Sequence, residues 1–180
     1  MNTKQGFSAS GLEPYASKIR RAVDAMEKSS VISCIWQKDY TLWKKRHEEI
    51  SNRLGWLEAP ERAKQSLGSV KSFVRDVQRD GFTHALLLGM GGSSLAPEVL
   101  SRVFGTAPGY LKLDVLDSTD PAAVLSAARA LPFEKTLFIV SSKSGTTLET
   151  SSFLNFFYTQ TCDRVGKEKA GAHFVAITDP

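Results

Sequence analysis

The segment from Thr136 to Thr150 reads T-L-F-I-V-S-S-K-S-G-T-T-L-E-T. An apolar, β-branched run ends in a turn rich in hydroxyls and glycine, and a helical pattern rich in aromatic residues follows. Such a turn directs backbone N–H groups and hydroxyls at one point, beside the positive end of a helix dipole. The segment therefore predicts an anion site, with phosphate as the first candidate.

A second turn of this kind lies upstream, at Gly89-Met-Gly-Gly-Ser-Ser94. It follows the short apolar run His84 to Gly89 and precedes apolar residues at helical spacing. Glycines permit positive φ angles and a close approach of the backbone to a ligand. Two such turns in one parallel sheet favour a pocket for a small sugar phosphate.

The order of elements predicts the fold class. From residue 82 onward, apolar runs alternate with helical patterns, which is typical of βαβ units and a parallel sheet covered on both faces. The expected strands are 84–89, 111–117, 136–141 and 173–178, and the expected helices are 95–104, 121–131 and 147–161. We predict a doubly wound, mostly parallel, flavodoxin-like α/β domain over residues 81–180, which packs with an N-terminal helical segment over residues 1–80. In that segment we expect helices at 13–28, at 35–54, and from Pro60 to a stop at Gly81.

The flavodoxin-like strand order 2-1-3-4 would make the first and third strands neighbours, and ligands bind beyond the carboxyl ends of strands where the order reverses. Those two strands carry the two turns. We therefore expect both turns to converge on one phosphorylated ligand, with hydroxyls from Ser93, Ser94, Ser142, Ser144, Thr146 and Thr147.

Composition excludes several other classes. No apolar run reaches the roughly 18 residues of a membrane span, and no signal-type apolar region follows the start. The net charge of +4 is mixed with acids at helical spacing, so we expect no nucleic-acid partner. Two isolated cysteines predict a reducing cytoplasm, and three scattered histidines predict no metal site. The sequence stops just after its fourth expected strand, so we expect it to be a piece of a longer chain, truncated at its C-terminal end.

Two other interpretations stay open at this level. Glycines after a strand often serve only a tight turn, and Ser or Thr before a helix is often only an N-cap. A dinucleotide-binding Rossmann domain is the second, because Gly89-x-Gly91-x-x-Ser94 nearly fits the glycine fingerprint and Asp117 ends the second strand. The third small position is a serine, however, and the S-K-S-G-T-T loop has no purpose in that scheme.

Four segments resemble a known family. The stretches L-L-L-G-M-G-G-S-S-L-A-P-E (86–98) and S-S-K-S-G-T-T-L-E-T (141–150) resemble the phosphosugar-binding half of glucose-6-phosphate isomerases, which have the sugar isomerase (SIS) fold. N-R-L-G-W-L (52–57) and D-S-T-D-P-A-A-V (117–124) resemble the branch that is fused behind a transaldolase in some bacteria. The resemblance covers roughly residues 36–180.

The resemblance implies roles for single residues. Ser142, Ser144 and Thr147 would hold the phosphate with help from the Lys143 backbone, and Gly92 and Ser93 would line the sugar. Glu149 matches a family glutamate that supports a catalytic histidine. This sequence has Ser144 and Gly145 where the commonest family pattern, S-K-T-F-T-T, has Thr and Phe.

The resemblance also implies a reaction. The family interconverts glucose 6-phosphate and fructose 6-phosphate by ring opening and enediol proton transfer, in glycolysis and gluconeogenesis. Its base, arginine, histidine and lysine lie downstream of the end of this sequence, so we expect this piece alone to be inactive. No metal or organic cofactor is implied, and a homodimer is expected for the full-length protein. A non-catalytic SIS-type sugar-phosphate sensing module is the alternative.

Overall fold

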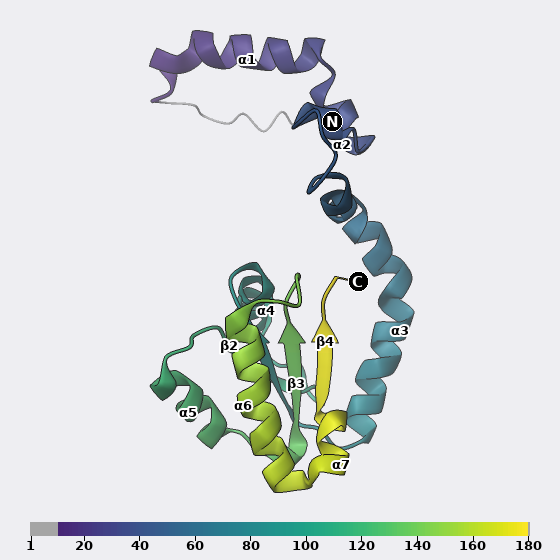
Figure 1. Ribbon diagram of the computed structural model, residues 1–180, viewed down its shortest axis with the longest axis vertical. Coiled ribbons are helices and arrows are strands. Elements are labelled where there is room, and N and C mark those ends of the chain that lie inside the picture. Colours follow the sequence, from purple (N-terminus) through teal and green to yellow (C-terminus); the bar gives the residue numbers. More distant parts are fainter. Residues whose placement is uncertain (1–10, 180) are drawn as a thin grey trace. The chain divides into compact units, whose positions relative to one another are not determined.

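The computed structural model describes residues 11–179, and Figure 1 gives the order of its elements. The chain divides into two compact units, Met1–Leu67 and Gly68–Pro180, and the division falls within one long helix. The predicted domain limits, 1–80 and 81–180, stay a prediction. No helix within the described range is both long and apolar enough to cross a membrane.

The first unit consists of short helical pieces. The 3₁₀ turn Glu13–Tyr15 leads into α1 (Ala16–Lys28), and α2 (Val31–Trp36) follows. Two further 3₁₀ segments, Tyr40–Leu42 and Ser51–Glu58, precede α3 (Ala59–Arg79). Leu54 and Leu57 are its buried hydrophobic residues among those described.

The predicted helix over residues 35–54 is wrong. Helix α2 ends at Trp36, and Lys38 and Glu49 have φ angles of 59°, in the left-handed region that a helix cannot contain. Asp39 adds a local competitor, because its carboxylate accepts hydrogen bonds from the backbone N–H and the hydroxyl of Thr41 at 2.9 and 2.6 Å. The apolar residues of this stretch suggested a helix, but its turns are fixed by such local bonds.

The second unit is a four-stranded parallel sheet. Its strands are β1 (His84–Gly89), β2 (Lys112–Leu116), β3 (Thr136–Ser141) and β4 (Phe174–Ile177), in the order β2-β1-β3-β4. The helices between them are α4 (Gly92–Phe104), α5 (Pro121–Ala130), α6 (Leu148–Val165) and the short α7 (Lys167–Ala170). The predicted fold class and strand order are therefore confirmed.

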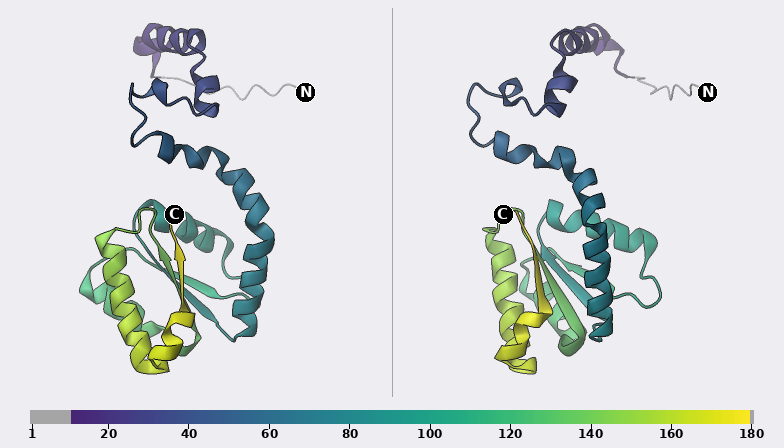
Figure 2. Two further views of the ribbon diagram at one scale, coloured as in Figure 1. Left: turned by 45° about the vertical axis from the view of Figure 1, so that its right-hand side comes forward. Right: turned by 90° about the vertical axis from the view of Figure 1, so that its right-hand side faces the viewer.

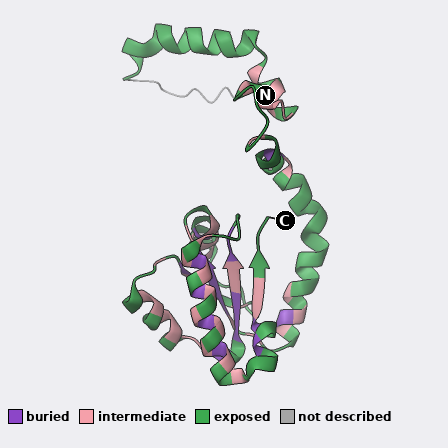
Figure 3. Cartoon of the chain, viewed as in Figure 1, coloured by how far each residue is buried: buried purple, intermediate pink, exposed green. Residues whose placement is uncertain are grey.

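The core lies between one face of the sheet and helices α5 and α6, with α4 on the other face (Figure 2). Alternate residues of the strands point to α6, and Phe153 and Phe157 meet them from the helix. Burial is concentrated in the strands and the inner side of α6 (Figure 3). The buried cluster consists of Leu86, Leu88, Leu116, Phe133, Phe138, Phe153 and Phe157.

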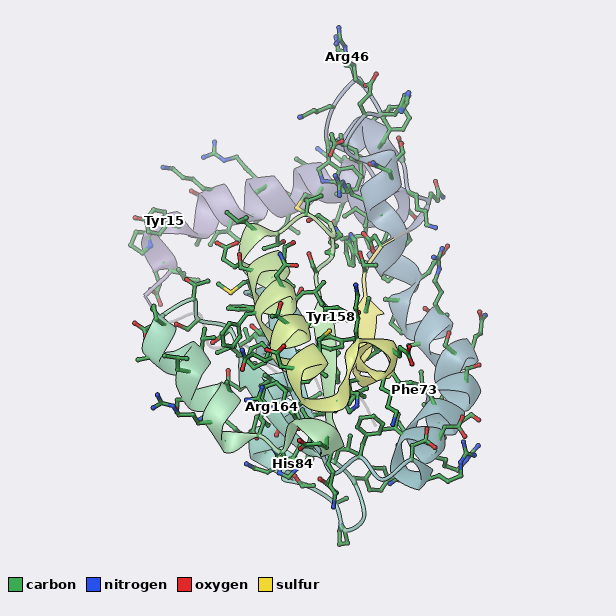
Figure 4. The ribbon with its side chains drawn as sticks, turned by 60° about the horizontal axis from the view of Figure 1, so that its bottom comes forward. Tyr15, Arg46, Phe73, His84, Tyr158 and Arg164 are labelled. Carbon is green, nitrogen blue, oxygen red and sulfur yellow. The ribbon has the colours of Figure 1, made fainter. Side chains whose placement is uncertain are left out.

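Helix α6 is less apolar all round than its sequence suggested. Tyr158 and Arg164 project from it in Figure 4, where Tyr158 is 5.4 Å from the ring of Phe174. The Arg164 guanidinium lies 4.0 Å from the centre of the Phe133 ring, a cation–π contact that covers the edge of the core. The helix is thus held to the sheet by its aromatic residues while its outer side remains polar.

Candidate functional site

The two glycine- and hydroxyl-rich turns meet at their roots. Gly89 ends β1 directly opposite Ser141 at the end of β3. A Cβ atom placed on Gly89 would lie 3.1 Å from the Ser141 carbonyl oxygen and 3.2 Å from the Ser93 Cβ. These distances are too short for a comfortable contact, so glycine at this position lets the two strand ends and the start of α4 approach one another.

The first loop, Gly89–Ser94, is shaped by its backbone. Gly91 is the N-cap of α4 with φ 56° and ψ −119°, a conformation that side chains strongly disfavour. The hydroxyl of Ser94 is buried and donates to the Gly91 carbonyl at 3.0 Å. Ser94 therefore stabilises the turn itself, while Gly92 is exposed and Ser93 half-buried.

The second loop, Ser142–Thr147, is organised by its hydroxyls. Ser142 Oγ donates to Thr147 Oγ1 at 3.2 Å, across the mouth of the loop. Ser144 Oγ accepts from the backbone N–H and the hydroxyl of Thr146, at 3.3 and 3.0 Å. Gly145, with φ 67°, makes the turn between them. The loop thus places four hydroxyls within a six-residue span before a helix.

Helix α6 begins at this loop. Thr147 is its N-cap residue, and its side chain makes no capping hydrogen bond to the helix. The helix start directs unpaired N–H groups and a partial positive charge toward the loop, which favours an anion. Glu149 lies in the first turn and is half-buried.

The end of β4 forms a third side that sequence reasoning did not include. The Ser142 N–H donates to the Ile177 carbonyl at 3.0 Å. The Lys143 carbonyl accepts from the Asp179 N–H at 3.1 Å and from the Thr178 hydroxyl at 3.4 Å. The signal for these residues was available, because the carboxyl ends of all parallel strands lie at one edge of a sheet.

The predicted ring of hydroxyls is therefore only partly brought together. Ser142, Ser144, Thr146 and Thr147 share one loop whose hydroxyls pair with one another. Ser93 lies beside Gly89 at the root of that loop, whereas the Ser94 hydroxyl is bound within its own turn.

The largest hollow lies elsewhere, between β2 and α5. It measures about 420 Å³ and is lined by Leu86, Lys112, Asp114–Ser118, Ala123, Ser126, Ala127, Ala130 and Leu131. None of the predicted phosphate-binding residues lines it, although Asp117 does. Among residues 11–179, no three His, Cys, Asp or Glu side chains gather in a way that would hold a metal ion.

The strand order, together with loops at the carboxyl ends of β1 and β3, defines the class: an open, parallel α/β protein with its candidate site at the switch point of the sheet. The sequence model described as phosphoglucose isomerase matches residues 61–179. This match covers most of the chain, and the chain belongs to the phosphoglucose isomerase family.

Curated relatives agree with this assignment. A protein named glucose-6-phosphate isomerase from Citrifermentans bemidjiense is 35% identical over 143 residues, which are 68% of this chain and 26% of that protein. One of the same name from a Geobacter species is 31% identical, over 92% of this chain and 31% of that protein. The chain thus spans between a quarter and a third of the length of these relatives.

Solved structures give the same result. A glucose-6-phosphate isomerase from Chlamydia trachomatis superposes with a TM-score of 0.59 at 27% identity, over 81% of this chain and 26% of that one. A hypothetical protein from Thermus thermophilus superposes with a TM-score of 0.60 at 29% identity, over 87% of this chain and 36% of that one.

Proposed function

We propose that this chain is the phosphosugar-binding portion of a glucose-6-phosphate isomerase, which interconverts glucose 6-phosphate and fructose 6-phosphate. The observation that carries the proposal is the Ser142–Thr147 loop, where paired hydroxyls stand before the start of α6 at the switch point of the sheet. Relatives that bear the isomerase name, and the family match, support the choice of substrate.

The phosphate would sit against Ser142, Ser144 and Thr147. Two details of the loop support this position. The Thr147 hydroxyl is not used as a helix cap, so its hydrogen is available to a ligand. The Lys143 carbonyl points to the end of β4, and a trans peptide directs the following N–H, that of Ser144, to the opposite side.

The sugar would extend from the phosphate toward Gly92 and Ser93, which stand at the root of the second loop. Lys143 is exposed, so its backbone is the better candidate for contact with the ligand. Glu149, in the first turn of α6, would support a catalytic histidine that this sequence does not contain at a matching position.

The chemistry of the family is ring opening followed by proton transfer between C2 and C1 through an enediol. A base must stand within hydrogen-bond reach of the C2 proton. We assign no such base to residues 11–179, because Glu149 has the supporting role. The 180-residue chain is thus proposed to bind phosphosugar weakly without isomerising it. We further propose a cytoplasmic location and a homodimer for the whole protein.

The phosphate position is tested by Ser144→Ala combined with Thr147→Val, which removes two hydroxyls from the loop. Hydrogen bonds to charged groups contribute about 1.5–3 kcal/mol each, so affinity for glucose 6-phosphate should fall by about tenfold or more. Titration calorimetry measures this, with Thr159→Val as a matched control, since Thr159 lies on the exposed side of α6. Equal affinity of the double variant and the wild type, with the fold intact, would refute the assignment.

The absence of turnover has its own test. A coupled assay on the purified chain should detect no isomerisation above background. Turnover in the ordinary enzymatic range of about 1–10³ per second would mean that residues of this chain carry the base.

A further inference from the structure

One buried hydroxyl of α6 has no hydrogen-bond partner. Thr150 is 2% exposed, and its Oγ1 contacts no donor or acceptor at bonding distance among residues 11–179. A buried hydroxyl without a partner costs free energy, and a valine of the same shape would avoid that cost. Such a group in a native structure calls for a reason.

The other hydroxyls of the same helix behave differently. Those of Ser152, Thr159 and Thr161 each donate to the carbonyl four residues earlier, at 2.8, 2.9 and 2.7 Å. For Thr150 that carbonyl belongs to Thr146, which lies in the loop before α6 begins. The usual acceptor of a helical threonine is therefore not part of the helix at this position.

The position of Thr150 connects it with the anion loop. Thr150 shares its burial and its spacing with Phe153 and Phe157, so it belongs to the side of α6 that faces the sheet. It is the first member of that row, three residues after Thr147. Residues three apart are neighbours on a helix surface, which places Thr150 next to the residue whose hydroxyl pairs with Ser142.

We propose that Thr150 is a positioning residue of the anion site, and the inference rests on the proposed phosphate-binding function. In the structure the Ser142 hydroxyl donates to Thr147 Oγ1. When the loop holds the phosphate of a phosphosugar, the hydroxyls of Ser142 and Thr147 both donate to the phosphate oxygens. Thr147 Oγ1 then loses its donor, and the Thr150 hydroxyl replaces it. The unpaired hydroxyl thus gains its partner in the bound state.

The test separates binding from stability with three variants of the full chain. Thr150→Val removes the hydroxyl and keeps the shape, whereas Thr150→Ser keeps the hydroxyl. Thr161→Val is the matched control, because Thr161 is a buried threonine of the same helix whose hydroxyl is already bonded to the Phe157 carbonyl. Titration calorimetry with glucose 6-phosphate and with inorganic phosphate gives the affinities, and thermal unfolding without ligand gives the stabilities.

The proposal predicts opposite outcomes for the two valine variants. Thr150→Val should bind both ligands about tenfold more weakly, the effect of one hydrogen bond, and unfold at the wild-type temperature or above it. Thr150→Ser should bind within about threefold of the wild type. Thr161→Val should unfold at a lower temperature and keep its affinity.

Two results would overturn the inference in different ways. Wild-type affinity in Thr150→Val, beside measurable binding by the wild type, would reject the role of Thr150 and leave the phosphate site standing. No saturable binding of either ligand by the wild type would reject the phosphate site, and the positioning role with it.

Discussion

The loops after β1 and β3 look alike in sequence, but they use their residues in different ways. In Gly89–Ser94, glycines let the backbone approach its neighbours, and the buried Ser94 hydroxyl closes its own turn. In Ser142–Thr147, the hydroxyls pair with one another near the surface. The first loop is therefore a spacer that brings two strand ends together, and the second is the part that can exchange its hydrogen bonds for those of an anion.

The largest effect is expected at Gly89. Gly89→Val should destabilise the fold by about 3 kcal/mol, because the new side chain meets the Ser141 backbone and Ser93, and overpacking of this kind typically costs 1–3 kcal/mol. Chemical denaturation measures the change. Gly92→Ala is the matched variant for stability, since no atom lies within 4 Å of its added Cβ. Similar losses in both would remove the distinction between a packed and an open glycine.

A smaller effect is expected at Gly145 in the second loop. Its φ angle of 67° is left-handed, while the nearest atom to an added Cβ is Thr178 Oγ1 at 3.5 Å. Gly145→Ala should therefore cost about 1–2 kcal/mol from backbone conformation alone, without a clash. Gly145→Asn should recover part of this loss, because asparagine tolerates that conformation. If alanine and asparagine are equally harmful in denaturation, the cost arises from packing instead.

The smallest effect separates the hydroxyls of the two loops. Ser94→Ala should lower stability by about 1 kcal/mol, since it removes a buried hydrogen bond, and leave the affinity for glucose 6-phosphate nearly unchanged. Ser142→Ala should lower that affinity by about three- to tenfold and change stability less. Calorimetry and thermal unfolding on the same two proteins provide both values. The comparison fails if Ser94→Ala weakens binding as strongly as Ser142→Ala.

Much of the α/β unit was predictable from the sequence because its signals are local and strong. Continuous apolar runs such as His84 to Gly89 and Thr136 to Ser141 have the length of buried strands, and their bounds were predicted without error. The stretch 35–54 was predicted wrongly, since left-handed residues at Lys38 and Glu49 have no clear sequence signature. The contribution of β4 to the loop through Ile177 and Asp179 was also missed, because it depends on contacts between segments far apart in the chain.

The sequence by itself determined the class of fold, the strand order and the two loops that carry the candidate site. Periodicity and turn residues act over a few positions, so they are visible in the order of amino acids. Only the tertiary structure decided what each hydroxyl does. Ser94, Ser142 and Thr150 are all small hydroxyl-bearing residues beside a helix start, yet one closes a turn, one pairs across the loop and one is buried without a partner. That difference depends on which groups the packed chain brings within hydrogen-bonding distance, and no local pattern specifies it.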